Sequence, residues 1–265
     1  FDAVKTTADL ARVPLTLKTE LRESLAAQPP LGRHLAAPMS KVIQIQASSG
    51  TTGSPSYVGL THHDIRVWCE MGARTMFANG LRPGDVCLHG FSMSKGFVGG
   101  LPMVQILQYM GVCDIPVGAD AGVERLLRVC ADQRPQVITG TPYFVIYLAE
   151  QAPTVLGREA KTLGVRNISV GGEPGGGIPA VRASAEALWG AEVREMLGGT
   201  DLGCTYFGEC EDKSGMHFCA QEFILFEVID PETDAPLPLE AGVKGELVYT
   251  AIDREASPLL RFRTG

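Results

Sequence analysis

One stretch decides how this chain folds and what it is built around: Ser48-Ser49-Gly50-Thr51-Thr52-Gly53-Ser54-Pro55. Before it, residues 41–47 alternate between apolar and polar side chains, which is typical of a strand. After it, residues 61–64 have the spacing of a helix capping box, and apolar residues recur at helical spacing until Gly80. The chain therefore reads here as a strand, a glycine-rich loop and a helix.

The chemistry of residues 48–55 suits the binding of an anion. Glycine lets successive backbone N–H groups converge on one point, and the Ser and Thr hydroxyls add hydrogen-bond donors without bulk. A Walker P-loop is disfavoured, because Lys should follow the second glycine directly, whereas Ser54-Pro55 follows Gly53 here. The loop therefore predicts a phosphate site, and the alternative is a Ser/Gly-rich surface linker.

Strand-like and helix-like segments alternate beyond the loop. Strands are expected at 85–89, 112–117, 137–140, 165–170 and 191–197, and helices at 99–110, 122–132, 142–150 and 179–189. This alternation predicts βαβ units with right-handed crossovers and a mainly parallel sheet.

The pattern changes after residue 204. Strands at 223–230 and 245–251 are joined by a turn region rich in Pro, Asp and Glu, which predicts a small antiparallel subdomain. We therefore expect an α/β fold: a mainly parallel sheet with flanking helices in residues 1–203, and an incomplete β-rich subdomain in residues 204–265. Residues 7–26 should dock onto this body. Neither end carries a closing element, so we expect a piece of a longer protein, truncated at both ends.

Composition restricts the class of protein. The chain has 265 residues, of which 45% are hydrophobic, enough for a sizeable core. Its net charge of −7, without a block of like charges, argues against nucleic acid or an anionic membrane as a partner. The sequence has no long apolar run and no signal-peptide pattern. The odd number of cysteines, 7, indicates reduced thiols, so we expect a cytoplasmic protein.

Three predicted strands end in segments that differ from ordinary connections. These are Gly140-Thr141-Pro142, Gly171-Gly172-Glu173-Pro174 and Gly198-Gly199-Thr200-Asp201. Ligands of parallel sheets bind at the carboxyl ends of the strands. We therefore expect the three segments to form a ligand site with the loop at 48–55.

The pattern Ser-Ser-Gly-Thr-Thr-Gly-x-Pro at 48–55 resembles the phosphate loop of the adenylate-forming enzymes, the acyl-CoA synthetases and their relatives. Glu246-Leu247-Val248 and Arg261-Phe262-Arg263-Thr264-Gly265 resemble two later motifs of that superfamily. Thr141-Pro142-Tyr143 and Glu209-Cys210-Glu211 resemble its phenylacetate-CoA ligase branch. The resemblance implies part of the large N-terminal domain of such an enzyme, without the C-terminal lid domain that carries the family's catalytic Lys.

This resemblance implies an AMP-forming acid–CoA ligase for a small aryl acid or a short acid with or without a hydroxyl group. Such an enzyme joins the acid to the α-phosphate of ATP, with Mg²⁺ present, and then transfers the acyl group to coenzyme A. Two unit charges about 4 Å apart repel by about 4 kcal/mol at an effective dielectric of about 20, so the site must supply positive potential. Two alternatives stay open: an adenylating enzyme that loads a carrier protein or an amine, and a nucleotide-binding module without catalysis.

The resemblance also assigns roles to individual residues. The β- and γ-phosphates would bind Ser48, Ser49, Gly50, Thr51, Thr52 and Gly53. The nucleotide would also contact Gly198 and Gly199, and it would contact Gly172, Glu173 and Pro174, which resemble the family's adenine-contacting segment. Thr200 would hold the α-phosphate. Asp201 matches the family's Mg²⁺-binding Glu with one methylene fewer, and the alternative is a turn residue. Leu197 stands where the family has a Tyr that stacks on adenine.

The expected pocket for the acid is inferred from where residues lie in the expected fold. Phe97, Tyr143, Phe144 and Gly171 are expected to line it, and the alternative for these residues is ordinary core packing. Ser92-Met93-Ser94-Lys95 is more polar than the branch pattern, which leaves room for a smaller or hydroxylated acid.

A zinc site is a further expectation. Some members of the branch hold zinc through positions that Cys210 and His217 match, and Cys219 lies two residues on. Thiolate and imidazole are preferred zinc ligands, although three ligands make an incomplete tetrahedral set. The alternative is reduced cysteines on a hairpin. The expected partners are ATP, coenzyme A and the acid, and a homodimer is an open alternative to a monomer.

Overall fold

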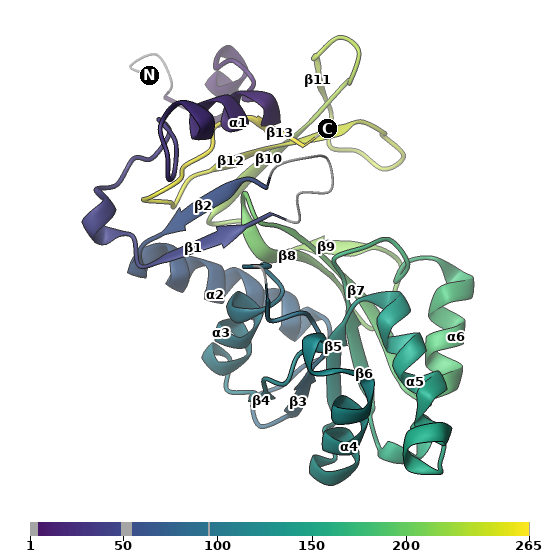
Figure 1. Ribbon diagram of the computed structural model, residues 1–265. Coiled ribbons are helices and arrows are strands. Elements are labelled where there is room, and N and C mark those ends of the chain that lie inside the picture. The colour runs from purple at the N-terminus through teal and green to yellow at the C-terminus, as the bar shows by residue number, and fades with distance from the viewer. Residues whose placement is uncertain (1–4, 49–54, 95, 265) are drawn as a thin grey trace. The chain divides into compact units, whose positions relative to one another are not determined.

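The computed structural model describes residues 5–48, 55–94 and 96–264, and every structural statement below concerns these residues. The chain divides into two compact units (Figure 1). Unit 1 combines Phe1–Val67 with Gln221–Gly265, and unit 2 is Trp68–Ala220. Helix α2, His62–Ala78, belongs in part to each unit. None of the helices in the described residues combines the length and the apolar composition of a membrane span.

Unit 2 is built on one seven-stranded sheet with the strand order β4-β3-β5-β6-β7-β8-β9. The strands are β3 Val86–His89, β4 Cys113–Ile115, β5 Val137–Gly140, β6 Asn167–Val170, β7 Glu192–Gly199, β8 Gly203–Glu209 and β9 Met216–Phe218. The five strands from β4 to β7 pair in parallel, whereas β8 and β9 add in antiparallel fashion. The predicted parallel α/β arrangement is therefore confirmed.

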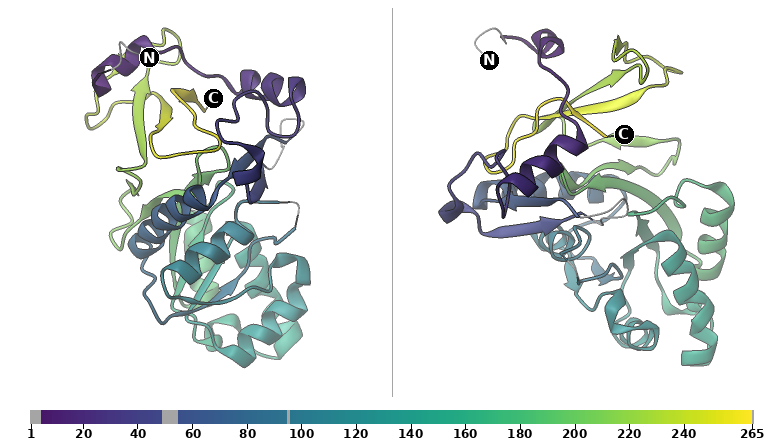
Figure 2. Two further views of the ribbon diagram at one scale, coloured as in Figure 1. Left: turned by 90° about the vertical axis from the view of Figure 1, so that its left-hand side faces the viewer. Right: turned by 45° about the horizontal axis from the view of Figure 1, so that its top comes forward.

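Four further helices flank this sheet: α3 Leu101–Tyr109, α4 Val123–Gln133, α5 Pro142–Leu156 and α6 Pro179–Trp189. Helices α5 and α6 lie side by side, and with α4 they cover one face of the sheet (Figures 1 and 2). Helix α4 buries one face there through Leu126, Leu127 and Cys130. Trp189 closes this core, and its indole N–H donates to the Val145 carbonyl at 2.8 Å.

One helix end differs from the prediction by more than two residues. Helix α5 was expected to end at 150, but it continues through Pro153 to Leu156. The added turn is kept because Ala152 is buried in the core and Val155 and Leu156 pack against it, and tertiary packing overrides the local preference of Pro.

Unit 1 contains two antiparallel sheets. A two-stranded sheet pairs β1 Gln44–Ala47 with β2 Tyr57–Leu60. A four-stranded sheet has the order β11-β10-β12-β13, with β10 Ile224–Ile229, β11 Pro236–Leu237, β12 Glu246–Ala251 and β13 Phe262–Arg263. The predicted antiparallel pairing of the two long strands, β10 and β12, is confirmed.

The N-terminal segment docks onto the four-stranded sheet, as expected. It contains a 3₁₀ turn, Thr7–Arg12, and helix α1, Lys18–Ala27. Between them, Thr16 donates its N–H to Arg261 and accepts the N–H of Arg263, at 2.9 and 3.0 Å. The Arg261 guanidinium donates to the Val13 carbonyl at 2.7 Å, and it is held by Glu227 at 3.0 Å. Unit 1 is thus made of two segments that lie far apart in the sequence.

The division into residues 1–203 and 204–265 stays a prediction. Residues 204–220 carry most of β8 and all of β9, which belong to the large sheet of unit 2. Sequence patterns did not indicate this continuation, because an antiparallel strand added to a parallel sheet has no signal of its own in the local pattern.

Candidate functional site

The glycine-rich loop connects two paired strands. Ser48 and Ser56 close the hairpin: the Ser48 N–H donates to the Ser56 carbonyl at 2.9 Å, and the Ser56 N–H donates to the Ser48 hydroxyl at 2.8 Å. The other predicted phosphate ligands, Ser49, Gly50, Thr51, Thr52 and Gly53, lie outside the described residues. Strand β2 stands between the loop and α2, and the sequence analysis did not predict it.

The predicted capping box begins α2. The Thr61 N–H donates to the Asp64 carboxylate at 2.9 Å, and the Asp64 N–H donates to the Thr61 hydroxyl at 3.2 Å. The same carboxylate accepts the N–H groups of Glu255 and Ala256 at 2.8 and 3.1 Å. One buried carboxylate therefore caps the helix and ties it to the segment before β13.

The strand-end segments of β5 and β6 meet at one edge of the unit 2 sheet. Gly140 pairs with Val170, and the Gly171 N–H donates to the Gly140 carbonyl at 3.1 Å. Because both strands run in parallel, their carboxyl ends lie at the same edge. A Cβ atom on Gly172 would lie 3.8 Å from the Thr141 methyl, which shows that the two segments are in contact.

Aromatic side chains stand at the same edge. Phe91 follows β3, and its ring centroid lies 6.2 Å from that of Phe97. Both rings lie beside Gly172, where a Cβ atom would be 3.5 Å from Phe97 and 3.9 Å from Phe91. Tyr143 is 53% exposed, and its N–H donates to the Glu173 carboxylate at 3.4 Å. Phe97, Tyr143 and the Gly171-Gly172 pair are thus brought together.

Phe144 is not part of this group. It is partly buried against the core that α4, α5 and α6 form with the sheet. Neighbouring residues on a helix point about 100° apart, so Tyr143 and Phe144 face different surroundings. For Phe144 the structure therefore agrees with the alternative reading of core packing.

In the Gly198-Gly199-Thr200-Asp201 segment, the two glycines end β7, and Thr200 and Asp201 begin the tight turn to β8. The pairing shifts register between Leu197 and Gly199, and any Cβ on Gly198 would collide with the Cys204 carbonyl. Thr200 and Asp201 are 6% and 7% exposed, and Leu197 is 42% exposed. Glycine is required here because two backbones pass at close range. The Mg²⁺ role of Asp201 and the phosphate role of Thr200 stay predictions.

The expected zinc ligands do not form a ligand set. His217 is exposed on β9 opposite Gly208, while Cys219 is buried and its Sγ lies 3.4 Å from the His217 carbonyl. Burial raises the pKa of the Cys219 thiol, which disfavours the thiolate that zinc needs. Within the described part of the chain, no group of three or more His, Cys, Asp or Glu residues could hold a metal ion.

Sequence analysis missed a buried pair of titratable residues beneath the aromatic group. His89 on β3 and Asp114 on β4 have fully buried side chains, and Nδ1 lies 3.9 Å from the carboxylate. The His89 ring packs edge-on against Phe91, with centroids 6.0 Å apart. Burial lowers the pKa of His89 to about 4 and raises the pKa of Asp114 to about 7. The signal available in the sequence was two titratable residues inside apolar strands.

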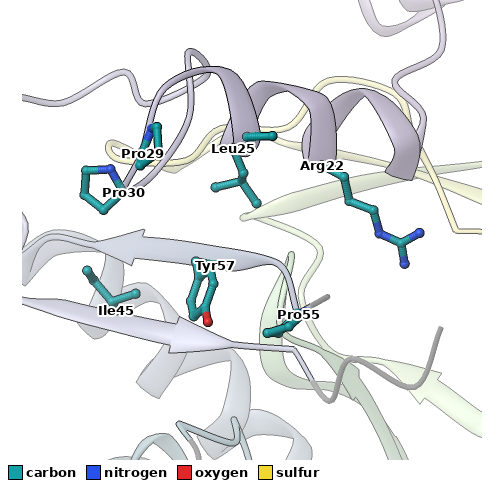
Figure 3. Close-up of a pocket in the computed structure, with 8 residues that line it drawn as sticks. Arg22, Leu25, Pro29, Pro30, Ile45, Pro55 and Tyr57 are labelled. Carbon is teal, nitrogen blue, oxygen red and sulfur yellow. The ribbon is translucent and has the colours of Figure 1, made fainter. Parts of the chain in front are cut away.

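A separate cavity of about 540 Å³ lies in unit 1, between α1 and the β1–β2 hairpin (Figure 3). Its walls are apolar and come from Leu25, Pro29, Pro30, Ile45 and Tyr57, among others. Arg22 supplies a charged group at its border (Figure 3). None of the residues predicted to bind the nucleotide or the acid lines this cavity among those that the structure describes.

Comparison with known proteins gives consistent results. Residues 2–251 match the AMP-binding enzyme family. A phenylacetate-coenzyme A ligase of Thermus thermophilus is 36% identical over 259 residues, covering 97% of this chain and 55% of the relative. A ligase of the same name from Pseudomonas putida is 34% identical, covering 97% and 56%. The chain thus spans about half the length of the curated relatives it matches.

Solved structures show the same architecture. A 2-hydroxyisobutyryl-CoA ligase, in complex with 2-HIB-AMP and CoA, superposes with a TM-score of 0.91 at 31% identity, over 100% of this chain and 55% of that chain. ATP-bound MatB from Rhodopseudomonas palustris superposes with a TM-score of 0.60 at 18% identity, over 82% and 41%. The second likeness concerns the fold alone.

Proposed function

Because the chain belongs to the AMP-binding enzyme family, we propose that it is the nucleotide- and acid-binding part of an AMP-forming acid–CoA ligase. One observation of the structure carries the proposal. The glycine segments after β5 and β6 meet the Phe91–Phe97 pair at one edge of the parallel sheet. Such an edge offers backbone N–H groups for an anion beside an apolar wall for the organic part of an acid.

The proposed reaction has two steps. A carboxylate oxygen of the acid bonds to the α-phosphorus of ATP, and the bond to pyrophosphate breaks. The sulfur of coenzyme A then gives up its proton and bonds to the acyl carbon, and the bond between that carbon and the AMP oxygen breaks. The residues at 48–53 would hold the β- and γ-phosphates, and Thr200 would hold the α-phosphate. Backbone and hydroxyl donors suit this task because they are fixed before the charge develops.

Mg²⁺ would neutralise part of the phosphate charge. Asp201 offers a carboxylate, the oxygen ligand that Mg²⁺ prefers, and it closely follows Gly198 and Gly199, where the close approach of β8 fixes the backbone. Zinc is not part of the proposal, because His217 is exposed whereas Cys219 is buried.

The acid is proposed to be a small aryl acid or a short acid that can carry a hydroxyl group. Asp120 pins the loop after Phe91 by accepting from the Ser92 hydroxyl, the Met93 N–H and the Ser94 hydroxyl, at 2.9, 2.7 and 3.1 Å. These hydrogen bonds, that from the Ser92 hydroxyl foremost, lower the pKa of Asp120. A pinned polar loop beside aromatic walls supports a compact acid over a long chain.

The cytoplasm is the proposed compartment. All seven cysteines are free thiols, which supports a reducing environment.

Acid-dependent exchange of pyrophosphate into ATP by the complete protein tests the first step. We expect exchange with at least one acid in a panel of aryl and short hydroxy acids, followed by a CoA thioester. Exchange without a thioester would favour the carrier- or amine-loading alternative. No exchange with any acid, in a folded protein that binds ATP, would support the non-catalytic alternative and contradict the proposal.

The loop has its own test. Replacing Thr51 and Thr52 by Val removes two hydroxyl donors, so the Kd of an ATP analogue should rise at least about tenfold while the fold is kept. Thr154→Val, an exposed change on α5, is the matched control. Equal affinity of the loop variant and the control would show that residues 48–55 are a linker.

A further inference from the structure

The connection between β6 and α6 has little to fix its shape on its own. Residues 171–178, called the adenine loop below, contain the predicted adenine-contacting residues Gly172, Glu173 and Pro174. The loop forms no regular secondary structure and includes three successive glycines. Gly172 and Gly175 have φ angles of +85° and +151°, which favour glycine. Such a backbone loses much entropy on ordering, so its position must be set by contacts with its surroundings.

Arg182, in the first turns of α6, provides such a contact. Its Nε donates to the Gly176 carbonyl at 2.7 Å. Its Nη2 lies 2.6 and 2.7 Å from the two carboxylate oxygens of Glu209 on β8. The two side chains are 14% and 5% exposed, so this charged pair lies largely out of water. Charge-assisted hydrogen bonds of this length are among the stronger polar contacts in proteins.

Glu209 extends the contact to the next strand. Its Oε2 also accepts the N–H of Glu195 on β7 at 2.7 Å. Strand β7 ends at Gly199 and leads into Thr200 and Asp201. The Arg182–Glu209 pair therefore connects the adenine loop, through Gly176, with the strands β7 and β8 on either side of the proposed phosphate and Mg²⁺ residues.

The packing beneath the loop leaves little room for another arrangement. A Cβ atom on Gly176 would lie 2.7 Å from a Val170 methyl and 2.9 Å from Glu195. A Cβ atom on Gly177 would lie 2.6 Å from a Glu195 carboxylate oxygen. The loop thus packs directly against β6 and β7, and the contact with Arg182 fixes its position there.

Neighbouring charges have other partners. Lys213 lies 2.6 Å from Glu186 and 2.5 Å from Glu192, so its ammonium is engaged next to α6. If Arg182 lost its guanidinium, the Glu209 carboxylate would be left buried without this cation, which is costly.

We propose that Arg182 is a positioning residue for the nucleotide. Through its contacts with Gly176 and Glu209, it fixes the position of the adenine loop relative to the turn that contains Thr200 and Asp201. The anchoring of the loop follows from the contacts above, and the part that names the nucleotide rests on the proposed function. Arg182 would act through the loop and not by touching the substrate.

The test compares Arg182→Lys with the unchanged complete protein. Lysine keeps the charge but replaces the fork by one ammonium, which cannot serve Gly176 and Glu209 in the same way. Hydrogen exchange of the amides at 172–178 should become about tenfold faster, while those of α5 keep their protection. The Kd of a non-hydrolysable ATP analogue should rise by a similar factor. Arg128→Lys, in an exposed pair with Glu124, is the matched control.

The outcomes separate the two claims. Unchanged exchange at 172–178 would overturn the anchoring, whether or not the protein is a ligase. Faster exchange with an unchanged Kd would overturn the role in nucleotide positioning. If the wild-type protein binds no ATP analogue, the proposed function fails together with the nucleotide role, and the exchange data still decide the anchoring.

A second variant, Glu209→Gln, tests the same network if Arg182→Lys does not fold. Glu209→Gln keeps the shape of the side chain and an acceptor for the Glu195 N–H, but removes the charge opposite Arg182. It should speed exchange at 172–178 in the same direction, and full protection there would contradict the proposed network.

Discussion

Asp114 and His89 show how burial sets the behaviour of single residues. In the unfolded chain the Asp114 carboxyl would lose its proton near its ordinary value of 3.8, but in the folded chain it keeps it up to about 7. Between these values the folded state binds more protons, so stability falls as pH rises and the loss is complete above pH 7. His89 acts oppositely: its pKa falls from 6.5 to about 4, so stability falls as pH drops through that window.

Asp114→Asn should therefore stabilise the protein most in alkaline solution. Asparagine has the same shape and no charge to bury. The gain in free energy of unfolding over wild type should be larger at pH 8 than at pH 4.5 by about 2 to 3 kcal/mol. Urea unfolding of the complete protein at both pH values measures it. Asp132→Asn, at an exposed site on α4, is the control, and an equal gain at both pH values would contradict the buried charge.

Among the secondary-structure elements, helix α2 begins with a cap that combines contacts between near neighbours with contacts to residues far away in the sequence. Its capping box was predicted from the spacing of Thr61 and Asp64, because both partners lie within one turn. The same Asp64 carboxylate also accepts the N–H groups of Glu255 and Ala256, and only the folded chain brings these residues together. Asp64 is 1% exposed, so water cannot replace its partners.

Asp64→Ala should consequently cost more than the loss of an ordinary cap. An exposed cap contributes about 1 kcal/mol, whereas leaving the N–H groups of Thr61, Glu255 and Ala256 without this acceptor should cost about 3 kcal/mol. Thermal or urea unfolding measures the difference. Glu124→Ala, an exposed acid in the first turn of α4, is the control and should cost less than about 1 kcal/mol. Similar costs for both variants would show that the Glu255 and Ala256 contacts add little.

Strands were predicted unevenly, and the reason is physical. Strand β5 was predicted with its observed bounds, Val137–Gly140, because a short apolar run marks a strand buried on both faces. Strands β2 and β8 were missed. Tyr57–Leu60 has a central glycine, and Gly203–Glu209 begins with one. Their pairing with β1 and β7, and not their own propensity, makes them strands.

At the scale of the whole molecule, segments distant in the sequence share one unit. Thr16 bridges to Phe262 in parallel, so the N-terminal segment and the last strand fold together in unit 1. A pattern read in windows of ten to twenty residues cannot reveal such a pairing. The boundary near residue 204 was predicted from a change of pattern along the sequence. The two compact units, in contrast, are defined by contacts between residues that can lie far apart in the sequence.

The isolated chain of 265 residues should bind nucleotide but form no CoA thioester. It spans about half the length of its curated relatives, and the resemblance places the catalytic Lys in a C-terminal lid domain. Calorimetry with an ATP analogue and a thioester assay, run beside the complete protein, measure both. Thioester formation by the 265-residue chain would contradict this expectation.

The sequence by itself determined the alternation of strands and helices, the capping box of α2, and the glycine segments that end β5, β6 and β7. These features depend on propensity, periodicity and turn chemistry, which act between near neighbours. Only the tertiary structure decided that Arg182 contacts Glu209 and that His89 lies beside Asp114. It also decided that Phe144 packs against the core and not beside Phe91 and Phe97. Such contacts depend on which faces of distant elements are buried together, and burial is a property of the folded chain.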